Sequence, residues 1–227
     1  MITWIILRAA GIGAYLMLFA SVAWGLVGTT SVVGKRVAKP TAIAIHQFIA
    51  TVAVVLLGIH LGGLLMDRFM PFGFVDVLVP MHSRFRAVAV AFGVVAMYAV
   101  LIVLVSSWLR KPLGTRWWRR LHLLAVPAFV MSLTHGAFAG TDTARPWMWW
   151  IYLSTGGLVL FLVLTRGLSA RIRAVRPAHP DRTARTAAPK EGSADQPEAP
   201  APRSAVSPAA TRAGPREPRK AAVKLEI

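Results

Sequence analysis

The sequence predicts an all-α membrane protein, a bundle of about five transmembrane helices followed by a disordered tail. First, 56% of the 227 residues are apolar and the mean hydropathy is +0.56, values typical of membrane proteins rather than soluble enzymes. Second, five apolar stretches approach the ~20 residues that a helix needs to cross a ~30 Å hydrocarbon core. Third, the composition changes abruptly near residue 170.

The five expected helices cover residues 9–28, 42–66, 87–108, 120–140 and 148–165. The first is longer than the apolar core of a usual signal peptide, and apolar residues already precede it, so we expect a retained helix. Residues 67–86 mix phenylalanines with two prolines and two aspartates. We expect this broken segment to lie at the membrane interface.

The chain divides into a membrane domain over 1–170 and a tail over 171–227. The tail is rich in Ala, Pro, Arg and Ser and has no aromatic residue, so it cannot bury enough surface to fold. Its first basic residues would lie against anionic lipid headgroups. Binding of nucleic acid is the weaker interpretation of the +17 net charge.

The basic residues of the connecting loops predict the orientation. The loops after the first and third helices hold Lys35, Arg36, Lys39, Arg110, Lys111, Arg116, Arg119 and Arg120. The alternate loops are nearly neutral, because they hold the three acids that precede the tail, Asp67, Asp76 and Asp142. Loops rich in Lys and Arg stay in the cytoplasm. We therefore expect a plasma- or inner-membrane protein with its N-terminus outside and its tail inside.

The absence of cysteine narrows the chemistry. A chain with no Cys has no disulfide, thiolate metal site, iron–sulfur cluster or cysteine nucleophile. The sequence also lacks a catalytic acid pair, a Ser-His-Asp arrangement and a glycine-rich phosphate loop. Hydrolysis and phosphoryl transfer are therefore poorly supported.

Four of the six histidines fall inside expected helices, where ionisable groups are costly and usually functional. His46 and His60 are 14 residues apart, about 21 Å along an ideal helix with an offset of only about 40°, so both face one side. His122 and His135 are 13 residues apart, which gives an offset of about 140° on an ideal helix. Pro127 lies between them, and a proline kink would recover part of the alignment.

The second and fourth helices are expected to run parallel, so the histidines pair level by level. His46 would face His122 near the cytoplasmic side, and His60 would face His135 near the outer side. Two imidazoles do not complete a closed zinc site. They do suit the two axial positions of a haem iron, so the bundle is expected to bind haem between helices two and four.

Two segments also resemble a known family. The residues SSWLRKPLGTRWWRRLHLLAVPAFVMSLTHGAFAGTDT, from Ser106 to Thr143, and the earlier HQFIATVAVVLLGIH are similar to the ferric reductase-like transmembrane domain. Ferric reductases, the membrane core of NADPH oxidases and the haem subunit of a bacterial methionine sulfoxide reductase system share this domain. The resemblance covers roughly residues 10–165 and implies that His46, His60, His122 and His135 are the iron ligands of two b-type haems.

The chain departs from this family in two respects. The family core usually has six helices, and the five expected here imply that an initial helix outside the haem-bearing group is missing. Many members continue into flavin- and nicotinamide-binding domains, but the residues after the last helix show no alternation of strands and helices. We therefore expect a separate flavoprotein, or quinol, as the electron donor.

Several further residues are candidates for the site. Haem carboxylates commonly find basic partners, so we expect Arg84, Arg86 and Arg145 outside and Lys35, Arg116, Arg119 and Arg120 inside to hold them. For the inner group, positive-inside topology explains the charges at least as well. His82 is more simply a solvated loop histidine than a contact for a metal or acceptor. Asp142 is more simply a helix cap or turn residue than part of an acceptor site.

Two further patterns, one of tryptophans and one of small residues, are typical of membrane helices in general and do not by themselves indicate a function. Tryptophans at the ends of the expected helices are typical interface anchors. Trp118 is among them, and a role for it against the inner haem is not supported by spacing. Small residues in the first helix would allow close helix packing or dimerisation.

The sequence therefore predicts transmembrane electron transfer through two bis-histidine haems, from a cytoplasmic donor to ferric iron, oxygen or a redox protein outside. The competing hypothesis is a divalent-metal transporter or metal-handling protein that uses the intramembrane histidines as transient ligands. Such a protein would favour at least one intramembrane carboxylate, which the expected helices lack. A third hypothesis is an interaction protein whose basic tail recruits partners at the membrane.

Overall fold

The computed structural model describes residues 2–28, 37–67 and 72–175, and within them every regular element is a helix. Four of the described helices are long and apolar enough to cross a membrane: α1 (Ile2–Val27), α3 (Lys39–Met66), α5 (Ala87–Trp108) and α8 (Pro146–Val175). The helices α6 (Arg110–His122) and α7 (Ala125–Ala139) meet at a bend of 40° and make a fifth span if the pair is counted as one. The expected all-α class is confirmed for this part of the chain, which has four spans, or the expected five if the bent pair is one span.

Two helix ends differ from the sequence prediction. Helix α1 begins at Ile2 rather than at residue 9, because the apolar residues before Arg8 continue the helix. Helix α8 ends at Val175 rather than at 165, so residues 171–175 of the expected tail are helical. The remainder of the expected tail lies outside the described residues.

The expected loop after the third helix is also wrong in part. Residues 110–119 are helical and belong to α6. Gly114 interrupts α6 with φ of 72°, a left-handed backbone conformation that glycine adopts without steric cost. The basic residues expected in a loop therefore lie mainly on a helix that leads directly into the next span.

The segment between α3 and α5 contains only the short helix α4 (Phe74–Leu78) among its described residues, and that helix is too short to span a membrane. Its first turn is capped by Asp76, whose Oδ2 accepts the backbone N–H of Gly73 at 2.9 Å. The Tyr98 hydroxyl donates to the Leu78 carbonyl at 2.6 Å and so joins this segment to α5.

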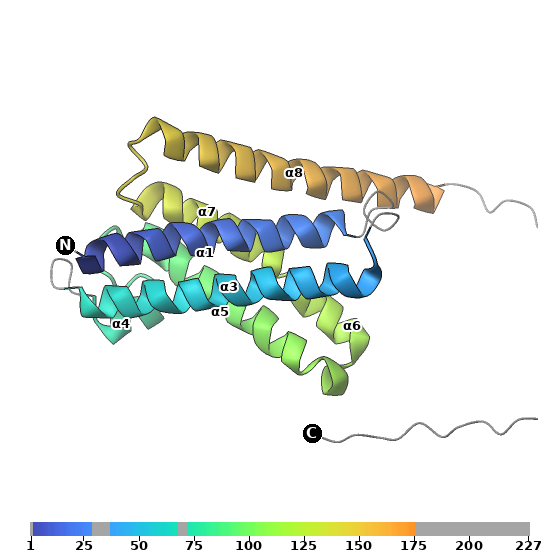
Figure 1. The fold of residues 1–227 in the computed structure, drawn as a ribbon, viewed down its shortest axis with the longest axis horizontal. Helices are drawn as coiled ribbons and strands as arrows, with labels where there is room; N and C mark the ends of the chain where they lie inside the picture. The colour runs from blue at the N-terminus through green and yellow to red at the C-terminus, as the bar shows by residue number, and fades with distance from the viewer. Residues whose placement is uncertain (1, 29–36, 68–71, 176–227) are drawn as a thin grey trace, which may run out of the picture. The chain divides into compact units, whose positions relative to one another are not determined.

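Helix α1 lies beside α3, and α8 packs against α1 and α7 (Figure 1). The core between α1, α7 and α8 centres on Tyr15, Phe129 and Tyr152. Tyr15 stacks on Phe129 with ring centroids 5.7 Å apart, and its hydroxyl hydrogen-bonds the Thr155 hydroxyl at 2.5 Å. Helix α1 is thus an integral part of the bundle.

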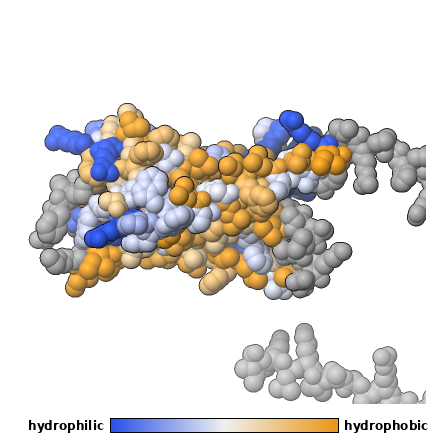
Figure 2. All heavy atoms as spheres, turned by 90° about the horizontal axis from the view of Figure 1, so that it is seen from above, coloured by the Kyte–Doolittle hydropathy of each residue, from blue (hydrophilic) through white to orange (hydrophobic). Residues whose placement is uncertain are grey.

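The outer surface is suited to lipid. Only 6% of the spanning window of α3 is buried inside the protein, although that helix is strongly apolar. Apolar side chains cover most of the described surface in Figure 2, and hydrophilic residues gather toward its ends. Because water would not favour so large an apolar area, these helices mark a membrane protein.

Candidate functional site

The four intramembrane histidines lie on two elements of the bundle, α3 and the bent pair of α6 and α7. His46 and His60 are on α3, His122 is the last residue of α6, and His135 is on α7. Each is half-buried. We call the two pairs that the structure forms the His46/His122 level and the His60/His135 level.

At the His46/His122 level the two imidazole rings lie close together. Their centroids are 6.0 Å apart, with an angle of 64° between the ring planes. Two imidazoles that bind one metal ion from opposite sides, through metal–nitrogen bonds of about 2 Å, also have centroids about 6 Å apart. The structure brings these two residues together as their spacing predicted, and the distance fits one ion between them.

Trp118 packs against this level. Its ring lies 5.1 Å from that of His122, tilted by 33°, because residues four apart share one side of a helix. The indole Nε1 donates to the Ser107 hydroxyl at 3.4 Å, and the Arg110 guanidinium lies 5.5 Å from the Trp118 ring centroid. Trp118 is therefore next to the candidate ligand His122. The four-residue spacing of the two was a signal in the sequence for this contact, so the expectation that spacing gave it no support is wrong.

The Nδ1 atoms of His46 and His122 are buried and have no hydrogen-bond partner within the described residues. A buried polar atom without a partner is costly. The two unpartnered nitrogen atoms are therefore an energetic cost that binding of a group at this level would have to offset.

The His60/His135 level is organised differently, because both rings are held by backbone carbonyls. His60 Nδ1 is 2.9 Å from the Leu7 oxygen on α1, and His135 Nδ1 is 2.8 Å from the Ala89 oxygen on α5. A carbonyl oxygen only accepts hydrogen bonds, so each Nδ1 carries the proton and donates it. Each Nε2 is therefore left with a lone pair, the state in which an imidazole binds a metal.

Glycines allow this close approach of the backbone. A Cβ atom on Gly11 of α1 would lie 2.8 Å from His60 Nδ1, and one on Gly93 of α5 would lie 2.7 Å from His135 Nδ1. Gly25 faces the other level, where a Cβ would lie 3.6 Å from His46 Cε1, an ordinary contact. Gly11 and Gly25 are 14 residues apart, like His46 and His60. This matched spacing was a signal in the sequence that the histidine spacings alone did not reveal.

The bend between α6 and α7 changes the relation between His122 and His135. Within it, Leu124 N–H donates to Leu121 O at 3.0 Å and Val126 N–H donates to Leu123 O at 3.2 Å, both three residues back. Leu123 N–H also donates three residues back, to Arg120 O at 3.3 Å. A residue in such a tight turn advances by about 120° instead of about 100°, so three such residues reduce the ideal offset between His122 and His135 from about 140° to about 80°. The expected local rewinding before Pro127 is therefore present and recovers part of the alignment.

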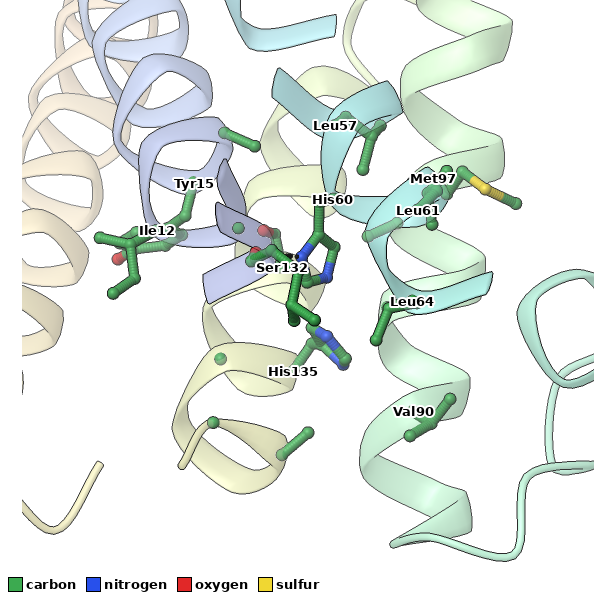
Figure 3. A pocket seen from close by; sticks show the side chains of 18 of the residues that line it. Ile12, Tyr15, Leu57, His60, Leu61, Leu64, Val90, Met97, Ser132 and His135 are labelled. Carbon is green, nitrogen blue, oxygen red and sulfur yellow. Dashed lines mark hydrogen bonds between the residues drawn. The ribbon is translucent and has the colours of Figure 1, made fainter. Parts of the chain in front are cut away.

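A cavity of about 240 Å³ opens beside His60 and His135 (Figure 3). Both imidazoles point into the same space between α1, α3, α5 and α7 in this view. Most of the wall is apolar, including Leu57, Leu61, Leu64, Val90, Val94 and Met97. The lining also includes the charged residues Arg8, Asp76 and Asp142.

The arginines expected to hold haem carboxylates do not line this cavity. Arg84 is exposed, and Arg86 lines a separate pocket and donates to the Phe138 carbonyl at 2.5 Å. The inner candidates Arg116, Arg119 and Arg120 are exposed, as is Arg145, and Lys35 lies outside the described residues. The cation that lines the cavity is Arg8, which the sequence prediction placed before the start of the first helix.

The structure also bears on the sequence predictions for Asp142 and His82. Asp142 lies in the turn between α7 and α8, as the sequence predicted, and its side chain pairs with Arg8, 134 residues away in the chain. The side chain of His82 is 54% exposed, and its Nε2 lies 3.9 Å from Asp76 Oδ1. His82 thus remains a surface loop residue, with one acidic neighbour.

No group of three or more His, Cys, Asp or Glu side chains in the described part of the chain is arranged to hold a metal ion. Two imidazoles per level do fit a haem iron, because the porphyrin supplies the other four ligands. Comparison of the chain with protein-family models, with curated proteins and with solved structures finds no significant match. The function must therefore be inferred from the chemistry of the site itself.

Proposed function

We propose that this chain is a haem b protein of the plasma or inner membrane that transfers electrons between the two sides of the bilayer. The observation that carries the proposal is the pair of Nδ1 hydrogen bonds from His60 and His135 to backbone carbonyls. These bonds leave two Nε2 lone pairs at one cavity. Two opposed neutral imidazoles are the ligand set of a low-spin haem iron.

The histidines would hold one haem at each level, His60 with His135 and His46 with His122. A bound b-type haem would supply a one-electron carrier at its iron. The protein residues fix the imidazoles: Leu7 and Ala89 orient one pair through their carbonyls, and Trp118 packs against His122 at the other. The apolar cavity wall keeps water away from the ligands.

The distribution of basic residues gives the proposed orientation in the membrane, and the proposed direction of electron transfer is stated relative to that orientation. Exposed basic residues gather on α6, and α8 carries further arginines toward its C-terminal end, which is the pattern of a cytoplasmic face. The N-terminus would then be outside and the tail cytoplasmic. The donor would be a separate flavoprotein or quinol, and the resemblance to ferric reductase-like domains suggests ferric iron, oxygen or a redox protein as the acceptor.

The alternative, a divalent-metal transporter, has less support. Divalent ions in proteins favour three or more nitrogen and oxygen ligands, and the described residues form no such group. In the described part of the chain, each level brings two imidazoles together without a third such side chain in position to bind the same ion.

The test is a reduced-minus-oxidised absorption spectrum of the purified full chain, with haem and protein quantified together. We expect a low-spin haem b spectrum and about two haems per chain. His60→Ala and His122→Ala should each remove one haem, because each breaks one level. The matched control is His82→Ala, which removes a histidine outside the spans and should keep both haems.

The possible outcomes separate the hypotheses. Folded protein expressed with haem available that contains none would overturn the haem proposal and lead to metal-transport assays. About one haem per chain in the wild type would mean that one level alone binds haem, and the two histidine variants would show which.

A further inference from the structure

The charged part of the cavity lining contains an ion pair that is separate from the histidines. Arg8 Nε donates to Asp142 Oδ2 at 3.0 Å, and Arg8 Nη2 donates to Asp142 Oδ1, so the contact is bidentate. The Trp4 ring lies against the guanidinium, with its centroid 5.5 Å from the Arg8 Cζ. Two neighbours thus fix the Arg8 side chain at the cavity.

The ion pair leaves Arg8 with hydrogen-bonding capacity. A guanidinium has five N–H donors. Asp142 accepts one from Nε and one from Nη2, so both Nη1 hydrogens and one Nη2 hydrogen remain for a second acceptor. The side chain of Arg8 is 35% exposed, and Arg8 is the one Arg or Lys among the described residues that line this cavity.

The cavity as a whole is amphiphilic. Aliphatic side chains form most of its wall around the two histidines. The charged side chains of the same lining are Arg8, its partner Asp142, and Asp76, whose Oδ1 lies 3.9 Å from His82 Nε2. Such a lining fits a flat apolar ligand that binds both imidazoles and carries an anionic group. Haem b is a ligand of this kind, because two carboxylates extend from one edge of an apolar ring.

We propose that Arg8 binds a carboxylate of the haem held at the His60/His135 level, and that Asp142 is the residue that positions Arg8. This inference rests on the proposed function. It assigns the carboxylate contact to Arg8 rather than to Arg84 or Arg86, which do not line the cavity. The roles of the two partners differ, since Arg8 attracts the carboxylate and Asp142 repels it while holding Arg8 in place.

The test compares haem b with its dimethyl ester, in which both carboxylates are blocked. Both are titrated into the full chain prepared without haem, in a His122→Ala background so that one level remains. A charge-assisted hydrogen bond should make binding of haem b about ten- to a hundredfold tighter than binding of the ester. Arg8→Gln should abolish this preference, because it removes the charge that the ester cannot use.

Two further variants distinguish a direct contact from a structural effect. Asp142→Asn keeps the Arg8 charge but loses the bidentate carboxylate that positions Arg8, so a preference for haem b should remain but be smaller than in the parent protein. Arg84→Gln removes an exposed arginine that does not line the cavity and should leave the preference at the wild-type value. If Arg8→Gln does not fold, the double variant Arg8→Gln with Asp142→Asn removes the charged pair as a whole without leaving Asp142 unpaired, and the preference for haem b should be lost in it as well.

The outcomes are separable from those of the proposed function. Equal binding of haem b and the ester by the parent protein, or an unchanged preference in Arg8→Gln, would overturn the Arg8 assignment while leaving the histidine site intact. Failure of the parent protein to bind either compound would instead contradict the proposed function.

Discussion

Glycines set how closely the backbone approaches the candidate ligands. Gly93 is the tightest case, since an added Cβ would come within 2.9 Å of three ring atoms of His135. At Gly11 the added atom would lie 2.8 Å and 2.9 Å from two ring atoms of His60. In both places the imidazole would have to move away from the carbonyl that now accepts its Nδ1–H. The site therefore depends on two positions that carry no side chain, Gly11 on α1 and Gly93 on α5.

Gly93→Ala and Gly11→Ala should each remove about half of the bound haem by displacing one imidazole of the His60/His135 level. Haem-to-protein ratios of the purified variants measure this loss. Gly62→Ala is the matched control, because an added Cβ there meets no atom within 4 Å. It should keep the full haem content, and alanine should favour the helix by about 1 kcal/mol. Full haem content in Gly93→Ala would contradict the proposed role of the close approach.

Tyr15 joins α1 to α8 through its hydroxyl. Removing that hydroxyl in Tyr15→Phe should destabilise the protein by about 1 kcal/mol, because the buried Thr155 hydroxyl loses its partner across the helix interface. Thermal unfolding in detergent measures the effect. Ser154→Ala is the control, since Ser154 is exposed and its hydroxyl bonds its own helix at the Ile151 carbonyl. A larger loss for Ser154→Ala than for Tyr15→Phe would be inconsistent with this interface.

At the scale of the helices, the bend between α6 and α7 places His122 and His135, which are 13 residues apart, opposite the two histidines of the single helix α3. Pro127 has no N–H to donate to the Leu123 carbonyl four residues back. That carbonyl instead accepts Val126 N–H at 3.2 Å, and the chain tightens before Pro127. The two levels therefore depend on a local backbone change rather than on ideal periodicity.

Pro127→Ala should weaken this arrangement. Alanine supplies the missing N–H, so the segment can adopt regular α-helical geometry and return toward an offset of about 140° between the histidines. We expect the variant to lose about one of two haems, measured by haem content and by the absorption spectrum. Pro146→Ala is the control, because a proline at the start of α8 replaces an N–H that has no partner within the helix. If Pro127→Ala retained both haems, the bend would not be required for the two levels.

Across the whole membrane domain, the distribution of charge predicts the orientation in the bilayer. The chain has no cysteine, so single cysteines can be introduced without removing others. In intact cells a membrane-impermeant maleimide should label Arg84→Cys and should label Arg116→Cys only after the membrane is permeabilised. Both positions are exposed in the structure, so burial does not explain a difference between them. The reverse labelling pattern would invert the proposed direction of electron transfer.

Hydropathy and residue spacing along one helix are local properties, so they were sufficient to predict the helical class, the approximate spans and the four intramembrane histidines. They were also sufficient for the pairing of His46 with His122, since parallel helices bring matched spacings to matched levels. The groups that surround the histidines were visible only once the helices were packed. The Leu7 carbonyl is 53 residues from His60, and Asp142 is 134 residues from Arg8. Contacts over such separations depend on how α1 packs against α3 and the α7–α8 connection, and no local pattern encodes that packing.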